Sequence, residues 1–166
     1  MVLDIGCGTE NWLIRSVDRC APGSVGIDPH LPDEFVGPSG VRGLVADVIP
    51  ERMGTFDVAT SLAVIEHLEP ADRDAMFADA RRLLRPDGLL VLTTPSPRSK
   101  PILEFLAYRL HVISEHEIRD HRAYYSLEEL RDFLGSCGFV VESSSTFQIG
   151  LNQLVVARRP PDEGLE

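Results

Sequence analysis

Short apolar stretches alternate with segments of helical periodicity along this chain of 166 residues. Such alternation is typical of a largely parallel β-sheet with helices on its faces. Seven stretches are predicted to be strands: residues 2–5, 24–28, 43–47, 56–62, 88–94, 139–146 and 151–157. The length suits one compact domain. We therefore expect a single α/β domain over residues 1–159, followed by a frayed tail over 160–166.

Two helices are indicated clearly between these strands. Residues 72–85 place their apolar side chains on one face with a period of 3.6 residues. Residues 127–137 follow a capping box of Ser126 and Glu129 and end at Gly138.

Weaker signals concern three other stretches of the chain. Residues 11–19 predict a short helix, and the proline- and glycine-rich stretch 29–42 predicts a loop. Residues 101–113 are too broadly apolar for a solvated helix, so we expect this segment to pack over another part of the protein. Trp12 and Phe105 are expected in the core.

Charge and composition exclude several classes of partner. The formal net charge is −10, which argues against a nucleic-acid partner and against an anionic membrane surface. No apolar run approaches the roughly 20 residues of a membrane span. The three cysteines lack the spacing of a metal site or a disulfide framework. We expect a reduced, cytoplasmic protein, as a monomer or a homodimer.

The stretch Val2-Leu3-Asp4-Ile5-Gly6-Cys7-Gly8-Thr9 joins a predicted strand to a predicted helix through two glycines. Glycines allow a tight turn there and the close approach of a ligand to the backbone. The next predicted strand ends in Asp28, where a carboxylate can accept hydrogen bonds from both hydroxyls of a ribose. Together these features predict a nucleoside-binding site.

The residues after the second glycine bear on which cofactor is bound. A dinucleotide fingerprint requires a small residue where this chain has Asn11, and Glu10 would lie close to a pyrophosphate. A ligand that carries a sulfonium and an ammonium group tolerates nearby carboxylates better. This comparison favours S-adenosylmethionine and leaves an NAD-linked oxidoreductase as the less favoured alternative.

With these motifs, the chain resembles the class I S-adenosylmethionine-dependent methyltransferases, and most of all the small-molecule group that includes ubiquinone- and menaquinone-biosynthesis enzymes. The resemblance rests on the following blocks: 2–9, 26–28, 56–58, 65–68, 84–88, 125–130 and 138–139. It implies a Rossmann-like, seven-stranded and mostly parallel sheet of order 3-2-1-4-5-7-6, with the last strand antiparallel and helices on both faces.

The resemblance also implies a cofactor site. Gly6 and Gly8 would lie under the methionine part of the cofactor, and Asp28 would hold the ribose. Asp47 would meet the adenine amino group, and Leu62 would close over the cofactor near the methyl group. The full set of expected cofactor-binding residues is Asp4, Gly6, Cys7, Gly8, Asp28, Pro29, Asp47, Val48 and Leu62.

The chain departs from the family pattern at three places. Glu10 stands where the third glycine is usual, and the first strand begins at Val2, without the helices that normally precede it. Ala63 stands where some relatives carry a metal-binding carboxylate, which leaves only Glu66 and His67, so no metal is expected. These departures leave open a catalytically inactive or truncated S-adenosylmethionine-binding module.

The expected reaction is methyl transfer to an oxygen, nitrogen or carbon atom of a small molecule. A base is needed only where the acceptor loses a proton. The candidates are His67, His116, His121 and Tyr125. Family analogy places acceptor recognition in an insertion over about 96–125. The alternatives are that His67 only fixes its loop and that residues 115–122 form a solvated surface turn.

Overall fold

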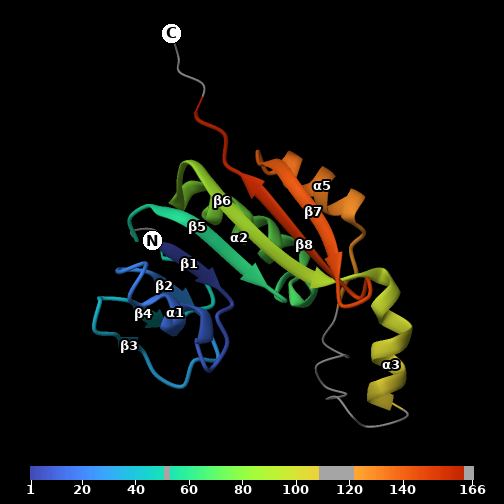
Figure 1. Cartoon of the computed structure of the whole chain (residues 1–166), viewed down its shortest axis with the longest axis horizontal. Helices are drawn as coiled ribbons and strands as arrows, with labels where there is room; N and C mark the ends of the chain where they lie inside the picture. The colour runs from blue at the N-terminus through green and yellow to red at the C-terminus, as the bar shows by residue number, and fades with distance from the viewer. Residues whose placement is uncertain (51–52, 109–121, 163–166) are drawn as a thin grey trace.

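The computed structural model describes residues 1–50, 53–108 and 122–162. Within these residues eight strands form one sheet (Figure 1). The strands are β1 (Val2–Ile5), β2 (Val25–Ile27), β3 (Phe35–Val36), β4 (Arg42–Leu44), β5 (Phe56–Leu62), β6 (Leu84–Pro95), β7 (Val140–Phe147) and β8 (Asn152–Arg158). The helices are α1 (Trp12–Val17), α2 (Pro70–Leu83), α3 (Lys100–Tyr108) and α5 (Leu127–Ser136), with two 3-10 turns, η1 (Ile65–His67) and η2 (Pro97–Ser99).

The order of the strands is β3-β4-β2-β1-β5-β6-β8-β7. Without β3 this is the predicted order, and β8 is antiparallel to both of its neighbours. The expected class of fold is therefore confirmed, and one strand was missed. β3 lies in the stretch expected to be a loop, where Phe35 pairs with Gly43 of β4. A Cβ atom on Gly43 would lie 2.4 Å from the ring of Phe35, so this glycine makes room for the extra strand.

The junction between α2 and β6 differs from the expected boundaries. The helix begins at Pro70 and ends at Leu83, and Leu84 already pairs with Phe56 of β5. The next paired residues are Val58 and Leu89. The turn at residues 86–88, which was expected to precede the strand, therefore forms an irregularity within β6. Asp87 in this turn has a φ of 62°. Each of the other predicted strands agrees with an observed strand to within a few residues at each end.

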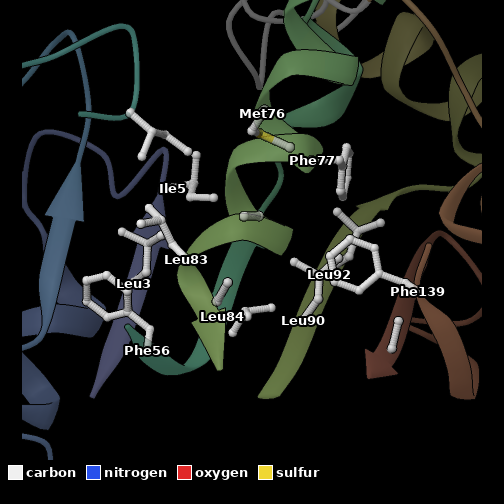
Figure 2. Packing of buried hydrophobic residues seen from close by; sticks show 14 of the residues in the cluster. Leu3, Ile5, Phe56, Met76, Phe77, Leu83, Leu84, Leu90, Leu92 and Phe139 are labelled. Atoms are coloured by element: carbon white, nitrogen blue, oxygen red, sulfur yellow. The ribbon is translucent and has the colours of Figure 1, made fainter. Parts of the chain in front are cut away.

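The main core lies between the sheet and the helices α2 and α5, which Figure 1 shows behind β5, β6, β7 and β8. Figure 2 shows apolar side chains from β1, β5 and β6 meeting Met76, Phe77 and Leu83 of α2. The rings of Phe77 and Phe133 join the two helices edge to face, with their centroids 5.1 Å apart. The predicted capping box at the start of α5 is confirmed.

The other face of β1, β2 and β4 is covered by the start of α1. Its key residue is Asn11, which is fully buried and has a φ of 51°. A Cβ atom on Gly26 would lie 2.7 Å from Oδ1 of Asn11, and one on Gly43 would lie 2.5 Å from its Nδ2. The two glycines thus leave the space that the Asn11 side chain fills, although its amide atoms have no hydrogen-bond partner among the described residues.

Two aromatic residues expected in the core are exposed instead. Trp12 is 76% exposed, because the short helix α1 buries only Ile14. Phe105 is 54% exposed on α3, which extends away from the sheet in Figure 1. Ile102 on the same helix is exposed as well, so these two side chains do not show the packing expected of this segment. No described helix has both the length and the apolar character that a membrane crossing needs.

Candidate cofactor-binding site

A cleft of about 840 Å³ lies where β1, β2 and β5 end. Its walls come from the loops after β1, β2, β4 and β5 and from one side of α2. Ligands bind at this place in open α/β sheets, because the carboxyl ends of the parallel strands leave a crevice there. The volume lies within the roughly 300–1,000 Å³ typical of small-molecule sites.

The glycine loop forms the floor of this cleft. Gly6 and Gly8 both have positive φ, 74° and 69°, which side chains other than glycine adopt at a cost. A Cβ atom on Gly6 would lie 2.4 Å from Val64, so the turn after β5 packs directly on the loop. A Cβ atom on Gly8 would meet nothing within 4 Å. The backbone at Gly8 is thus open to a ligand.

Asp28 connects the end of β2 to the glycine loop. Its Oδ2 accepts a hydrogen bond from the main-chain nitrogen of Gly8 at 2.8 Å, and its Oδ1 accepts one from the main-chain nitrogen of His30 at 2.8 Å. Each carboxylate oxygen can accept a second hydrogen bond, so Asp28 can still receive the hydroxyls of a ribose. Sequence reasoning missed His30, whose ring also lies 3.4 Å from Asp28 and lines the cleft. Its only sequence signal is its position two residues after the acid.

Two of the expected cofactor-binding residues lie beside the cleft instead of lining it. Asp4 is buried on β1, and its Oδ1 accepts a hydrogen bond of 2.6 Å from the hydroxyl of Thr60 on β5. Burial raises the pKa of Asp4, and nearby Asp28 raises it further, although the Thr60 bond acts against this. Burial also raises the pKa of the Cys7 thiol to about 12, with Asp4 and Asp28 contributing. Cys7 therefore stays a neutral thiol and is not a nucleophile at neutral pH.

The other expected cofactor residues do line the cleft: Gly6, Gly8, Asp28, Pro29, Asp47, Val48 and Leu62. Val48 and Leu62 are 68% and 38% exposed, so both present apolar surface to a ligand. Glu10 stands where the family pattern has its third glycine. Its side chain is exposed and does not line the cleft.

The four candidate bases are placed differently. His67 lines the cleft. The hydroxyl of Tyr125 accepts a hydrogen bond of 3.3 Å from Arg73 of α2, and Tyr125 is not among the residues that line the cleft. His116 and His121 lie outside the described residues. In the described part of the chain, no group of three or more His, Cys, Asp or Glu side chains is arranged to hold a metal ion.

Comparison with known proteins identifies the family. The family model described as a methyltransferase domain matches residues 1–144. The chain belongs to this family. The resemblance to class I S-adenosylmethionine-dependent methyltransferases is thereby confirmed, and with it the cofactor of that class.

Curated relatives of this methyltransferase domain include enzymes with different acceptors. The ubiquinone biosynthesis O-methyltransferase of Rhizobium etli is 32% identical over 104 residues, which cover 56% of this chain and 40% of that protein. The tRNA U34 carboxymethyltransferase of Cellvibrio japonicus is 30% identical over 106 residues, which cover 57% of this chain and 32% of that protein. The match therefore spans less than half the length of these relatives.

A solved structure shows the same fold. The S-adenosylmethionine-dependent methyltransferase from Mesorhizobium loti superposes with a TM-score of 0.69 over 95% of this chain and 90% of that chain. At 19% sequence identity this likeness concerns the fold alone.

Proposed function

We propose that this methyltransferase domain binds S-adenosylmethionine in the cleft and transfers its methyl group to an oxygen, nitrogen or carbon atom of a small-molecule acceptor. The observation that carries the proposal is the pair Gly8 and Asp28. A backbone open to a ligand and a carboxylate with free acceptor capacity stand side by side at the carboxyl edge of the sheet.

The residues that line the cleft suit the parts of this cofactor. Asp28 would accept hydrogen bonds from the ribose, and the exposed backbone at Gly8 would lie against the methionine part. Asp47 would bind the adenine amino group, with Val48 against the ring. Asp4 and Cys7 would support the loop from beneath, since Asp4 fixes β1 to Thr60 of β5.

When bound, the cofactor supplies a methyl group on a positively charged sulfur, already activated for displacement. The protein then has to align the acceptor and exclude water. Leu62 at the end of β5 presents an apolar side chain on the cleft and would keep water from the reacting atoms. His67, which lines the same wall, would accept the proton where the acceptor is a phenol or an alcohol.

The small-molecule acceptor is favoured over a nucleic acid by the charge of the chain. The net charge of −10 opposes binding to a phosphate backbone. The relative that acts on tRNA makes RNA the second candidate acceptor. A cytoplasmic location and a monomeric or homodimeric state remain predictions from the sequence.

The test is calorimetric titration of the purified chain with S-adenosylhomocysteine, with NADH as the control ligand. Binding of S-adenosylhomocysteine alone is expected. Tighter binding of NADH would contradict the proposal. Mass spectrometry of a panel of phenols, amines and transfer RNA, incubated with S-adenosylmethionine, then identifies the acceptor. Cofactor binding without methylation of any compound would favour a non-catalytic binding module.

A further inference from the structure

Glu66 is a buried carboxyl group within the turn that forms one wall of the cleft. Val64 and His67 on this turn line the cleft, whereas Glu66 does not and is 0% exposed. Its Oε2 accepts a hydrogen bond of 3.0 Å from the hydroxyl of Thr94, a buried residue of β6. Its Oε1 has no hydrogen-bond partner among the described residues. The side chain thus fastens the turn to the neighbouring strand.

The main chain of Glu66 makes contacts in a different direction. Its carbonyl oxygen accepts hydrogen bonds from the main-chain nitrogens of Arg122 at 2.7 Å and of Ala123 at 3.4 Å. These two residues belong to the end of the expected acceptor-side insertion, where the chain returns to the sheet. One residue therefore links β6, the wall of the cleft and the returning chain.

Gln153 also holds the returning chain, and it pairs with Thr94 across β6 and β8. It is a residue of β8, 3% exposed, and its Nε2 donates a hydrogen bond of 2.6 Å to the carbonyl oxygen of Tyr125. The ion pair of Arg122 with Glu69 lies outside these buried contacts, since both side chains are more than half exposed. Exposed ion pairs contribute little. The buried polar groups are therefore the stronger attachment.

We propose that Glu66 is a positioning residue, which fixes the wall formed by residues 62–68 relative to residues 122–125 of the acceptor-side segment. The proposal rests on the proposed function, because it concerns the two sides between which the acceptor would enter. A neutral carboxyl group can remain buried with a single neutral hydrogen bond, whereas an ionised one there is costly.

The electrostatic surroundings of Glu66 agree with a neutral group. Burial is the largest influence and raises its pKa, against the opposing effects of its own main chain, Thr94 and His67. The charged or titratable groups connected to it are His67 on the same turn, and Arg122 and Glu69 on the elements packed against it. Thr94 and Gln153 do not titrate.

The test compares Glu66→Gln, Glu66→Leu and Thr94→Val. Two quantities are measured: the hydrogen-exchange protection of the Arg122 and Ala123 amides, and the dissociation constant of S-adenosylhomocysteine. Glu66→Leu and Thr94→Val are expected to lower both protection and affinity by about threefold to thirtyfold, the usual range for residues that act through a neighbour. Glu66→Gln is expected to restore both, because its amide keeps an acceptor for Thr94. Thr94→Val is a nearly isosteric change that removes the same hydrogen bond. It therefore still tests the proposal if Glu66→Leu does not fold.

A pH series separates positioning from a purely structural role. In the wild type, protection and affinity are expected to fall as the pH rises through the ionisation of Glu66, whereas Glu66→Gln should show no such fall. Glu69→Gln is the matched control, since it removes only the exposed ion pair to Arg122. Wild-type protection and affinity in Glu66→Leu, or no rescue by Glu66→Gln, would overturn the positioning role. A wild-type chain that does not bind S-adenosylhomocysteine would overturn the proposed function instead, and the exchange data would still test Glu66.

Discussion

The main-chain nitrogen of Gly8 donates a hydrogen bond to Oδ2 of Asp28 over 2.8 Å. Gly8 follows β1 and Asp28 follows β2, so this bond joins the ends of two neighbouring strands at the floor of the cleft. It fixes the glycine loop before any ligand is present. A loop held in its binding conformation loses less conformational entropy when the ligand binds.

Replacing Asp28 with Asn tests this arrangement. The amide has one oxygen, so its NH₂ group must face either the Gly8 or the His30 main-chain nitrogen, and one donor then loses its acceptor. Each such loss costs roughly 1–3 kcal/mol, and we expect lower thermal stability together with weaker binding of S-adenosylhomocysteine. Calorimetry measures both, with Asp33→Asn, an exposed residue of the same loop, as the control. Wild-type affinity in Asp28→Asn would show that Asp28 does not bind the ribose.

Gly8 and Gly40 form a matched pair for the glycine loop. Both have positive φ, 69° and 79°, and a Cβ atom at either would meet nothing within 4 Å. Only Gly8 lines the cleft. Alanine at either position should cost about 1–2 kcal/mol of stability, because both stay in the left-handed region. Only Gly8→Ala should weaken binding of S-adenosylhomocysteine, and equal affinities in the two variants would contradict the placement of the cofactor.

Asp4 should give the fold a measurable pH dependence. Burial raises its pKa in the folded state above the ordinary 3.8. The stability that depends on neutral Asp4 is therefore fully present below pH 3.8 and is lost as the pH rises through the raised pKa. Asp4→Asn keeps an acceptor for Thr60 and removes this loss. The free energy of unfolding of Asp4→Asn minus that of the wild type should thus increase with pH in urea titrations. A difference that is independent of pH would show that folding does not raise the pKa of Asp4.

Substitution of Tyr125 is expected to change the stability of the fold, whereas substitution of His67 is expected to change the methylation rate. The Tyr125 hydroxyl accepts a hydrogen bond from Arg73, so Tyr125→Phe should lower stability by about 0.5–1.5 kcal/mol. The methylation rate, which can be measured once an acceptor is known, should not change in this variant. His67→Ala should instead lower that rate for a phenol or alcohol and leave the affinity for S-adenosylhomocysteine unchanged. A slow Tyr125→Phe enzyme would contradict this expectation and support Tyr125 as the base.

Most of the strands and helices were predictable, because hydrophobic periodicity and the glycine loop are local signals, whereas the order of the strands was implied by the resemblance to the family. The contacts that define the site were not, since their partners are distant in sequence. Asp4 and Thr60 are 56 residues apart, and Glu66 and Thr94 are 28 apart. The strand β3 was missed because it has only two residues, too few to show the alternation of apolar and polar side chains that indicates a strand. The exposure of Trp12 and Phe105 was missed for another reason: apolar character does not reveal whether a neighbouring element covers a side chain.

The buried side chain of Asn11 has a consequence for how this sequence can change over generations. It fills the space that Gly26 and Gly43 leave on two neighbouring strands. A larger residue at either glycine collides with it, and a smaller residue at position 11 leaves a cavity. Substitutions here should survive in compensated sets. A gain of volume on a strand would be matched by a loss at position 11 together with a shift of the second neighbour, Cys7 at Gly26 or Phe35 at Gly43. In a family alignment, we expect these three positions to covary.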